Sequence, residues 1–266
     1  MAANVQARKP WRLNALASLW SLAIILSLLG ACASSPAELA ATVLERYPHD
    51  TDAFTQGLLL EGGKLYESTG LYGRSSLREV DLHTGEVIRV RYLDSSHFGE
   101  GLAQVDERLI QLTWRAGRAL VYDLETFEPV GSFNYGGEGW GLCFDGEELW
   151  MSDGSATLFV RDPDTFEMRR RVAVTLRGEP LAMLNELECV DDRIYANVWQ
   201  TDRIVGIDKG NGRVDAVVDA SSLLSAEELA ALSPDAVLNG IAYDPQNERF
   251  LITGKLWPAL LAVRFE

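Results

Sequence analysis

The apolar and polar positions of this chain repeat in units, and each unit predicts a set of short strands. A unit opens with a small or polar entry and an apolar run, and a polar turn then leads to a second apolar strand. The second strands begin at Leu65, Leu109, Leu149, Ile194 and Phe250. Successive units lie about 40 to 45 residues apart, with a longer gap before the fifth, and that spacing is typical of a propeller blade.

A third strand follows in every unit, at residues 77–81, 120–123, 158–162, 204–208 and 260–265. The first four of these end in Asp and a turn, such as Asp81-Leu82-His83-Thr84-Gly85, and a β-rich segment comes next. That order predicts a strand, a turn and a fourth strand. We therefore predict an all-β fold, a five-bladed β-propeller over residues 42–266.

The two ends of the predicted domain complement each other. The fifth unit has no room for a fourth strand, whereas residues 42–47 form a strand without a unit. We expect the N-terminal strand to complete the last blade, which would remove an exposed sheet edge. The longer gap before the fifth unit contains Ser225-Ala226-Glu227-Glu228, a capping box that predicts a short helix through Leu232 as an insertion.

The first residues predict an export signal. Basic residues precede an apolar run over residues 13–29, and Gly30-Ala31-Cys32 follows. The run Leu29-Gly30-Ala31-Cys32 resembles the lipobox of bacterial lipoproteins, which implies a signal peptide at 1–31, a lipid on Cys32 and a tether over 32–41. With Ala33 and Ser34 next, the resemblance implies the outer membrane, facing the periplasm. The alternative is an uncleaved single-span anchor, for which the run is short.

Composition narrows the class of partner. Asp and Glu total 39 against 24 Lys and Arg, and the net charge of −15 argues against nucleic acid as a partner.

Cys143 and Cys189 are a possible disulfide pair in an oxidising compartment. Because each lies in an apolar strand, we favour two buried free thiols. The histidines at positions 49, 83 and 97 form no cluster, so we interpret them as structural or rim residues.

Two columns of the repeat hold residues that ordinary packing does not explain. The first column reads Gln56, Glu100, Trp140, Asn185 and Asn239, and the second reads Gly70, Trp114, Gly154, Trp199 and Lys255. The first strands of propeller blades line the central channel, so these polar and aromatic side chains are expected to converge there. They predict a small polar site with aromatic walls. The alternative is that they bond one another and plug the channel.

Several motifs together resemble the plant-type glutaminyl-peptide cyclotransferases, a family also found in bacteria. The motifs are Phe54-Thr55-Gln56-Gly57, Ser68-Thr69-Gly70-Leu71-Tyr72-Gly73-Arg74-Ser75, Phe98-Gly99-Glu100-Gly101-Leu102, Gly139-Trp140-Gly141-Leu142, Leu184-Asn185-Glu186-Leu187-Glu188, Trp199-Gln200-Thr201-Asp202, Leu238-Asn239-Gly240-Ile241-Ala242 and Thr253-Gly254-Lys255-Leu256-Trp257-Pro258. The resemblance implies a five-bladed propeller, without metal or other cofactor, that converts the N-terminal glutamine of peptides or proteins into pyroglutamate and releases ammonia.

Residue roles follow from the resemblance. Glu100 corresponds to the family's acid/base, and the substrate would be surrounded by Phe54, Gln56, Trp114, Trp140, Asn185, Trp199 and Lys255. The first column adds Asn239 to this set. One group that moves a proton from the attacking amine to the departing nitrogen serves both steps of ring closure, and Glu100 has that chemistry. Gln56, Asn185 or Lys255 could donate to the developing oxyanion.

Two other functions compete with this interpretation. Gln56, Glu100, Asn185 and Asn239 offer oxygen ligands, so a calcium-dependent propeller hydrolase is one alternative, although only one of them is a carboxylate. The other is a non-catalytic envelope scaffold that binds proteins through one face of the ring. In every case we expect contact with a membrane only through the lipid on Cys32.

Overall fold

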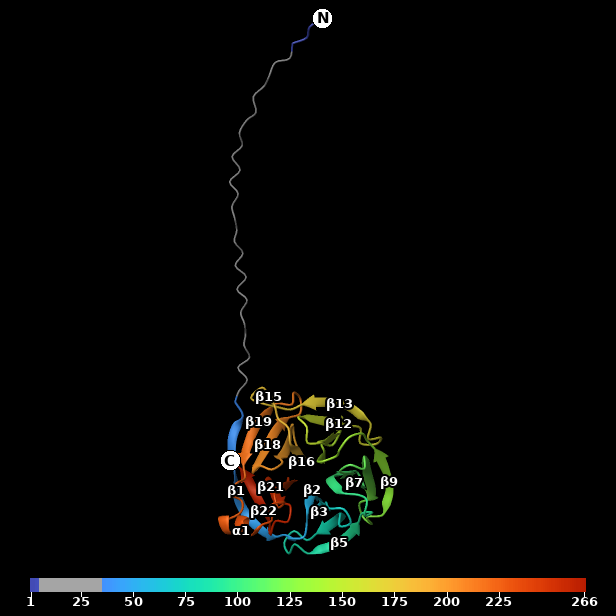
Figure 1. The fold of residues 1–266 in the computed structure, drawn as a ribbon, viewed down its shortest axis with the longest axis vertical. Helices are drawn as coiled ribbons and strands as arrows, with labels where there is room; N and C mark the ends of the chain where they lie inside the picture. The colour runs from blue at the N-terminus through green and yellow to red at the C-terminus, as the bar shows by residue number, and fades with distance from the viewer. Residues whose placement is uncertain (5–34) are drawn as a thin grey trace. The chain divides into compact units, whose positions relative to one another are not determined.

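The computed structural model describes residues 1–4 and 35–266, and the second range forms a five-bladed β-propeller (Figure 1). Cys32 and all but the first four residues of the predicted signal peptide lie outside the described residues. Leaving residues 5–34 aside, no helix is both long enough and apolar enough to cross a membrane.

Blades 1 to 4 are antiparallel sheets of four strands, and blade 5 has three strands of its own and takes its fourth from the N-terminus. The predicted order of blades is confirmed. Blade 1 contains β2 (Thr55–Glu61), β3 (Lys64–Thr69), β4 (Ser76–Val80) and β5 (Val87–Tyr92); blade 2 contains β6 (Gly99–Val105), β7 (Arg108–Thr113), β8 (Arg118–Asp123) and β9 (Pro129–Asn134); blade 3 contains β10 (Leu142–Phe144), β11 (Leu149–Met151), β12 (Thr157–Arg161) and β13 (Met168–Ala173); blade 4 contains β16 (Leu184–Val190), β17 (Arg193–Val198), β18 (Arg203–Asp208) and β19 (Val214–Asp219); blade 5 contains β20 (Leu238–Asp244), β21 (Arg249–Gly254) and β22 (Ala259–Phe265).

The hydrophobic core lies between the blades. Five apolar clusters fill the contacts between neighbouring blades, as where Leu77 of blade 1 packs in one cluster with Leu109 of blade 2. A second strand such as β3 is therefore buried along almost its whole length, whereas the outermost strands β5 and β13 are largely exposed. This arrangement explains why the second strands are mainly apolar runs.

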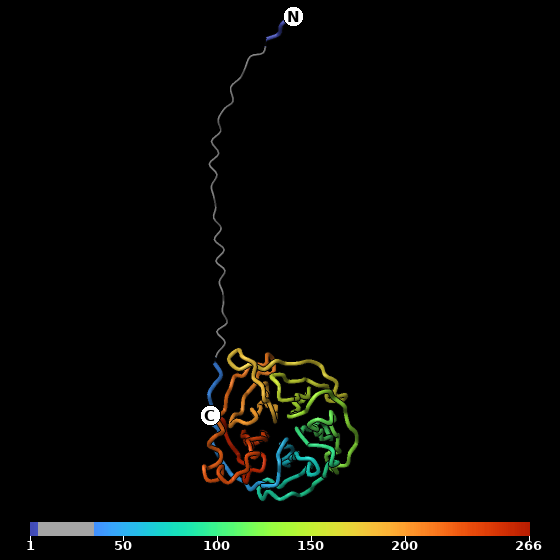
Figure 2. The backbone as a smooth tube through the Cα atoms, viewed as in Figure 1, coloured from blue at the N-terminus to red at the C-terminus, as the bar shows by residue number. Residues whose placement is uncertain are grey.

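The ring closes through the N-terminal strand, β1 (Ala37–Pro48). Residues 41–48 pair antiparallel with β22, so the prediction that this strand completes the last blade is confirmed. Figure 2 shows the result: the chain follows the ring in order, and its blue first strand lies beside the red last one.

The ordered domain begins earlier than the predicted boundary at Thr42. Residues Ala37–Ala40 were assigned to a tether, but they pair in parallel with Ala216–Asp219 of β19. β1 thereby joins blades 4 and 5 into one eight-stranded sheet. The physical reason is that the outer edge of blade 4 needs a hydrogen-bonding partner, and Leu39 packs against the apolar cluster between the two blades.

The helical insertion also forms as predicted. α1 (Ala226–Ala231) is capped by Ser225, whose hydroxyl accepts from the Glu228 backbone N–H, while the Glu228 carboxylate accepts from the Ser225 N–H at 2.8 Å. A small hairpin of β14 (Thr175–Leu176) and β15 (Glu179–Pro180) lies between blades 3 and 4 and was not predicted.

Candidate active site

A cavity of about 310 Å³ opens where the inner strands of the blades begin. The residues that line it are Phe54, Gln56, Leu71, Phe98, Glu100, Trp114, Trp140, Asn185, Trp199, Asp235 and Lys255. All of the predicted site residues but Asn239 are among them. The residues come from all five blades, so the cavity forms only when the ring is closed.

The first column converges because the inner strands share a local irregularity. In β2, β6, β16 and β20 the pairing with the second strand shifts register just after the strand begins. The shifts occur at Gln56, at Glu100, at Asn185 and at Asn239. A β-bulge turns a side chain out of its usual alternation, and here it directs polar side chains toward the channel axis.

Aromatic rings form two walls of the cavity. On one side, the ring centroids of Phe54 and Phe98 lie 6.1 Å apart and those of Phe98 and Trp114 lie 5.5 Å apart. On the other side, the centroids of Trp140 and Trp199 lie 5.4 Å apart, edge to face. Such edge contacts are the favoured geometry for aromatic pairs and fix the orientation of each ring.

The glycines of the second column leave room for these rings. A Cβ atom on Gly70 would lie 2.3 Å from the ring of Phe98, and one on Gly154 would lie 2.7 Å from the ring of Trp140. Any side chain at either position would displace a wall of the cavity. In the second column, each glycine therefore makes room for an aromatic ring of a cavity wall, and each tryptophan is itself part of a wall.

Glu100 is held by a chain of amide hydrogen bonds. Gln56 Nε2 donates to Glu100 Oε1 at 3.0 Å, and Asn239 Nδ2 donates to Gln56 Oε1 at 3.1 Å. Asn239 also donates to the Thr55 carbonyl and is fully buried, so it lies behind Gln56 and does not line the cavity. Asn239 was predicted to contact substrate, but in this structure it orients Gln56.

Two buried titratable groups face this cavity. Burial raises the pKa of Glu100 well above its usual range, the positive charge of Lys255 opposes the shift, and the negative charge of Glu138 adds to it. Burial lowers the pKa of Lys255 to about 8, while the charges of Glu100 and Asp235 oppose that shift. Lys255 can therefore exchange protons near neutral pH, and the raised pKa of Glu100 favours its protonated form more than in a free carboxyl.

Phe98, Leu71 and Asp235 were not selected as site residues from the sequence. A signal for Phe98 existed, because Phe54 and Phe98 each stand two residues before the polar residue of an inner strand. Leu71 lies in the loop after β3, and Asp235 follows the α1 insertion. The α1 insertion has no counterpart in the other blades, so the repeat could not identify Asp235.

The floor of the cavity is closed by close contacts between inner strands. A Cβ atom on Gly101 would lie 2.4 Å from the Leu142 nitrogen, and one on Gly141 would lie 2.0 Å from the Asn185 oxygen. Where blade 4 carries Glu186 instead of glycine, the buried carboxylate accepts from the Leu58 N–H at 3.2 Å and the Ile241 N–H at 2.8 Å. The glycines thus let neighbouring inner strands approach closely, and the carboxylate of Glu186 connects inner strands by hydrogen bonds.

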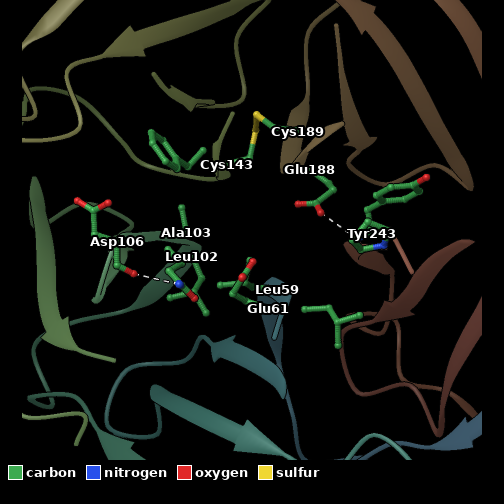
Figure 3. Close-up of a pocket in the computed structure, with 13 residues that line it drawn as sticks. Leu59, Glu61, Leu102, Ala103, Asp106, Cys143, Glu188, Cys189 and Tyr243 are labelled. Atoms are coloured by element: carbon green, nitrogen blue, oxygen red, sulfur yellow. Dashed lines mark hydrogen bonds between the residues drawn. A yellow bond between two sulfur atoms is a disulfide. The ribbon is translucent and has the colours of Figure 1, made fainter. Parts of the chain in front are cut away.

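A second cavity, of about 330 Å³, lies at the other ends of the same strands (Figure 3). The predicted free thiols are wrong, because Cys143 of β10 and Cys189 of β16 form a disulfide there. Their Cα atoms are 5.5 Å apart, since the inner strands of blades 3 and 4 are neighbours in the ring. Glu188 also faces this cavity and accepts from the Tyr243 N–H at 2.8 Å.

The histidine at position 49 is a structural residue. His49 is buried, its Nε2 lies 3.0 Å from Glu67 Oε1, and its Nδ1 lies 2.8 Å from the Trp257 carbonyl. Within residues 1–4 and 35–266, no three His, Cys, Asp or Glu side chains are grouped so that they could hold a metal ion.

Comparisons with known proteins point to a single family. The sequence profile of the glutamine cyclotransferase family matches residues 16–265. A glutaminyl-peptide cyclotransferase from Arabidopsis thaliana is 42% identical over 226 residues, which cover 84% of this chain and 71% of that protein. The crystal structure of Myxococcus xanthus glutaminyl cyclase superimposes with a TM-score of 0.82 and 40% identity, covering 87% of this chain and 99% of that chain.

Proposed function

The chain belongs to the glutamine cyclotransferase family, and we propose that Glu100 is the group that moves the proton in its reaction. The enzyme is a glutaminyl-peptide cyclotransferase, an acyltransferase that forms pyroglutamate. We propose that its substrates are peptides and proteins with an N-terminal glutamine. The observation that carries the proposal is the buried carboxyl of Glu100, which Gln56 orients toward the aromatic cavity.

During the reaction, one proton must move from the attacking amine nitrogen to the departing amide nitrogen. The neutral α-amine of the substrate attacks its own side-chain amide carbon, and a new C–N bond forms. Glu100 accepts the proton that the attacking nitrogen loses and donates it to the amide nitrogen, and the old C–N bond breaks to release ammonia. A carboxyl whose pKa burial raises above its usual range can both accept and return a proton.

Asn185 and Lys255 are the better donors for the developing oxyanion. Gln56 uses one of its two N–H groups to donate to Glu100, which fixes its amide toward that carboxyl. Asn185 lines the cavity, and the described residues provide no hydrogen-bond partner for its side-chain amide. Lys255 is also buried at the cavity, with its ammonium 4.9 Å from the Phe54 ring centroid. Fixed donors of this kind stabilise charge that appears only during the reaction.

The aromatic walls would keep the substrate folded. Ring closure needs the amine and the amide carbon within contact distance, and the walls leave little room for an extended glutamine side chain. The cavity is mostly apolar where Trp140 and Trp199 meet, which limits the access of water to the amide. Both effects favour cyclisation over hydrolysis.

Replacing Glu100 by Gln tests the role of its carboxyl. The variant keeps the shape of the side chain but cannot transfer a proton, so we expect kcat to fall roughly 10²- to 10⁴-fold with the fold intact. The assay measures ammonia release and the mass of the cyclised peptide. Glu128→Gln, the same change at an exposed site paired with Arg91, is the control. Near-normal turnover by Glu100→Gln would remove Glu100 from this role.

We also propose that the protein is exported and held at the cell envelope by a lipid on Cys32, at the outer membrane facing the periplasm. The support is the sequence alone, in which basic residues, an apolar run and Gly30-Ala31-Cys32 stand in the order of a lipoprotein signal. The disulfide between Cys143 and Cys189 agrees with an oxidising compartment.

A further inference from the structure

One carboxylate outside the cavity joins its two aromatic walls. Glu138 lies in the segment between β9 and β10, and its Oε2 atom accepts from Trp114 Nε1 at 2.7 Å and from Trp140 Nε1 at 3.1 Å. Trp114 belongs to the wall of blade 2, which includes Phe98, and Trp140 belongs to the wall that includes Trp199. A single oxygen atom therefore sets the distance between two indole rings from different blades.

The other oxygen of Glu138 fixes the carboxylate itself. Arg115 Nε donates to Glu138 Oε1 at 2.9 Å, and the Arg115 guanidinium lies 3.7 Å from the centroid of the Trp114 ring. Trp114 is thus held by a hydrogen bond at its edge and by a cation on its face. No other described carboxylate in the structure accepts from two indole N–H groups.

The charge state of Glu138 suits this arrangement. Burial raises its pKa, but hydrogen bonds from Trp140, Arg115 and Trp114 outweigh that effect and lower the pKa overall. The carboxylate is therefore ionised at neutral pH and can only accept hydrogen bonds. Bonds to a charged acceptor are stronger than those between neutral groups, so the two indoles are firmly oriented.

We propose that Glu138 is a positioning residue for cyclisation, which holds Trp114 and Trp140 at the separation that a folded N-terminal glutamine needs. The inference rests on the proposed function of this cavity. Glu138 does not line the cavity and contacts it through the two tryptophans, while its charge also contributes to the raised pKa of Glu100. Its loss should weaken binding of the folded substrate more than the chemical step, because the contact between Gln56 and Glu100 remains.

Glu138→Ala and Glu138→Gln separate this role from a general effect on stability. Alanine removes both indole contacts, and we expect KM to rise about tenfold or more while kcat changes less than about threefold. Glutamine retains one carbonyl oxygen that can accept from both indoles, so KM should return to within about threefold of the wild type. Tryptophan emission should shift in Glu138→Ala and recover in Glu138→Gln.

A change at an exposed glutamate serves as the control for the Glu138 variants. Glu128→Ala removes an exposed glutamate that pairs with Arg91 at 3.3 Å and should change neither KM nor emission. The inference is overturned if Glu138→Ala matches Glu128→Ala, or if Glu138→Gln is as impaired as Glu138→Ala, since the ion pair with Arg115 would then be the cause. If Glu138→Ala does not fold, slow exchange of both indole N–H protons in the wild type supports the inference, and exchange at the rate of a free indole overturns it.

Activity of Glu100→Gln is measured beside these variants. If Glu100→Gln keeps its turnover, the proposed proton transfer fails, but the KM and emission of the Glu138 variants still decide whether the walls are held as proposed.

Discussion

Glu188 makes the stability of the folded ring depend on pH. Its carboxyl faces the second cavity (Figure 3), and burial raises its pKa from 4.5 to about 8. The folded state therefore favours the neutral acid. The stabilisation is complete below the pKa of the unfolded chain and is lost as the pH rises toward 8. Glutamine at this position cannot ionise, and it can still accept the hydrogen bond from the Tyr243 N–H.

The expected magnitude follows from that shift. Each pKa unit corresponds to about 1.4 kcal/mol, so the shift sets a ceiling of about 5 kcal/mol. Because the cavity admits solvent to an ionised carboxylate, we expect Glu188→Gln to gain about 2–3 kcal/mol over the wild type between pH 5 and pH 9. Glu186, whose pKa burial also raises, is present in both proteins and contributes to each curve.

Urea unfolding without reductant, at several pH values, measures this difference in unfolding free energy. Asp106→Asn, which changes an exposed carboxylate of the same cavity, is the control and should follow the wild type. If the curves of Glu188→Gln and the wild type run parallel from pH 5 to pH 9, the reasoning from burial of Glu188 is refuted.

Two further predictions concern the floor of the cavity and the N-terminus. Gly141→Ala should lower the free energy of unfolding by roughly 1–3 kcal/mol or more and reduce kcat/KM, because its Cβ would lie 2.0 Å from the Asn185 oxygen. Gly131→Ala, where nothing lies within 4 Å of the added atom, is the control, and equal urea midpoints for the two variants would contradict the prediction. Cys32→Ser should partition into the aqueous phase of a detergent extraction or stay unprocessed, and mature membrane-bound Cys32→Ser would contradict lipidation.

The architecture was predictable because every blade obeys the same physical constraint. Inner and second strands are buried between neighbouring blades, so their apolar runs recur at a steady spacing. The capping box of Ser225 and Glu228 is a local signal and needs no tertiary information. The first half of β1 was missed for the opposite reason, since Ala37–Ala40 carries only one large apolar side chain, Leu39, and is ordered mainly by hydrogen bonds to β19.

The site was predictable as a column but not as a set of contacts. Asn239 stands at the position equivalent to Glu100, yet its side chain turns to Gln56, and the repeat cannot tell a cavity wall from the layer behind it. The disulfide was missed because the apolar surroundings of Cys143 and Cys189 favour free thiols, although a separation of 46 residues is close to one repeat and fits adjacent inner strands. Glu138 stands two residues before Trp140, as Phe54 and Phe98 stand before Gln56 and Glu100, but the sequence does not reveal that it accepts from two indoles.

The pairing of β1 also sets a time order for folding. β1 is the first strand of the domain to be synthesised, but its partner β22 (Ala259–Phe265) is the last. The ring cannot close, and the cavity cannot form, until β22 is available. A ribosome-bound chain would carry up to four blades and an unpaired first strand, and contacts so distant in sequence form slowly. The enzyme should therefore become active only after β22 has left the ribosome, in one late step.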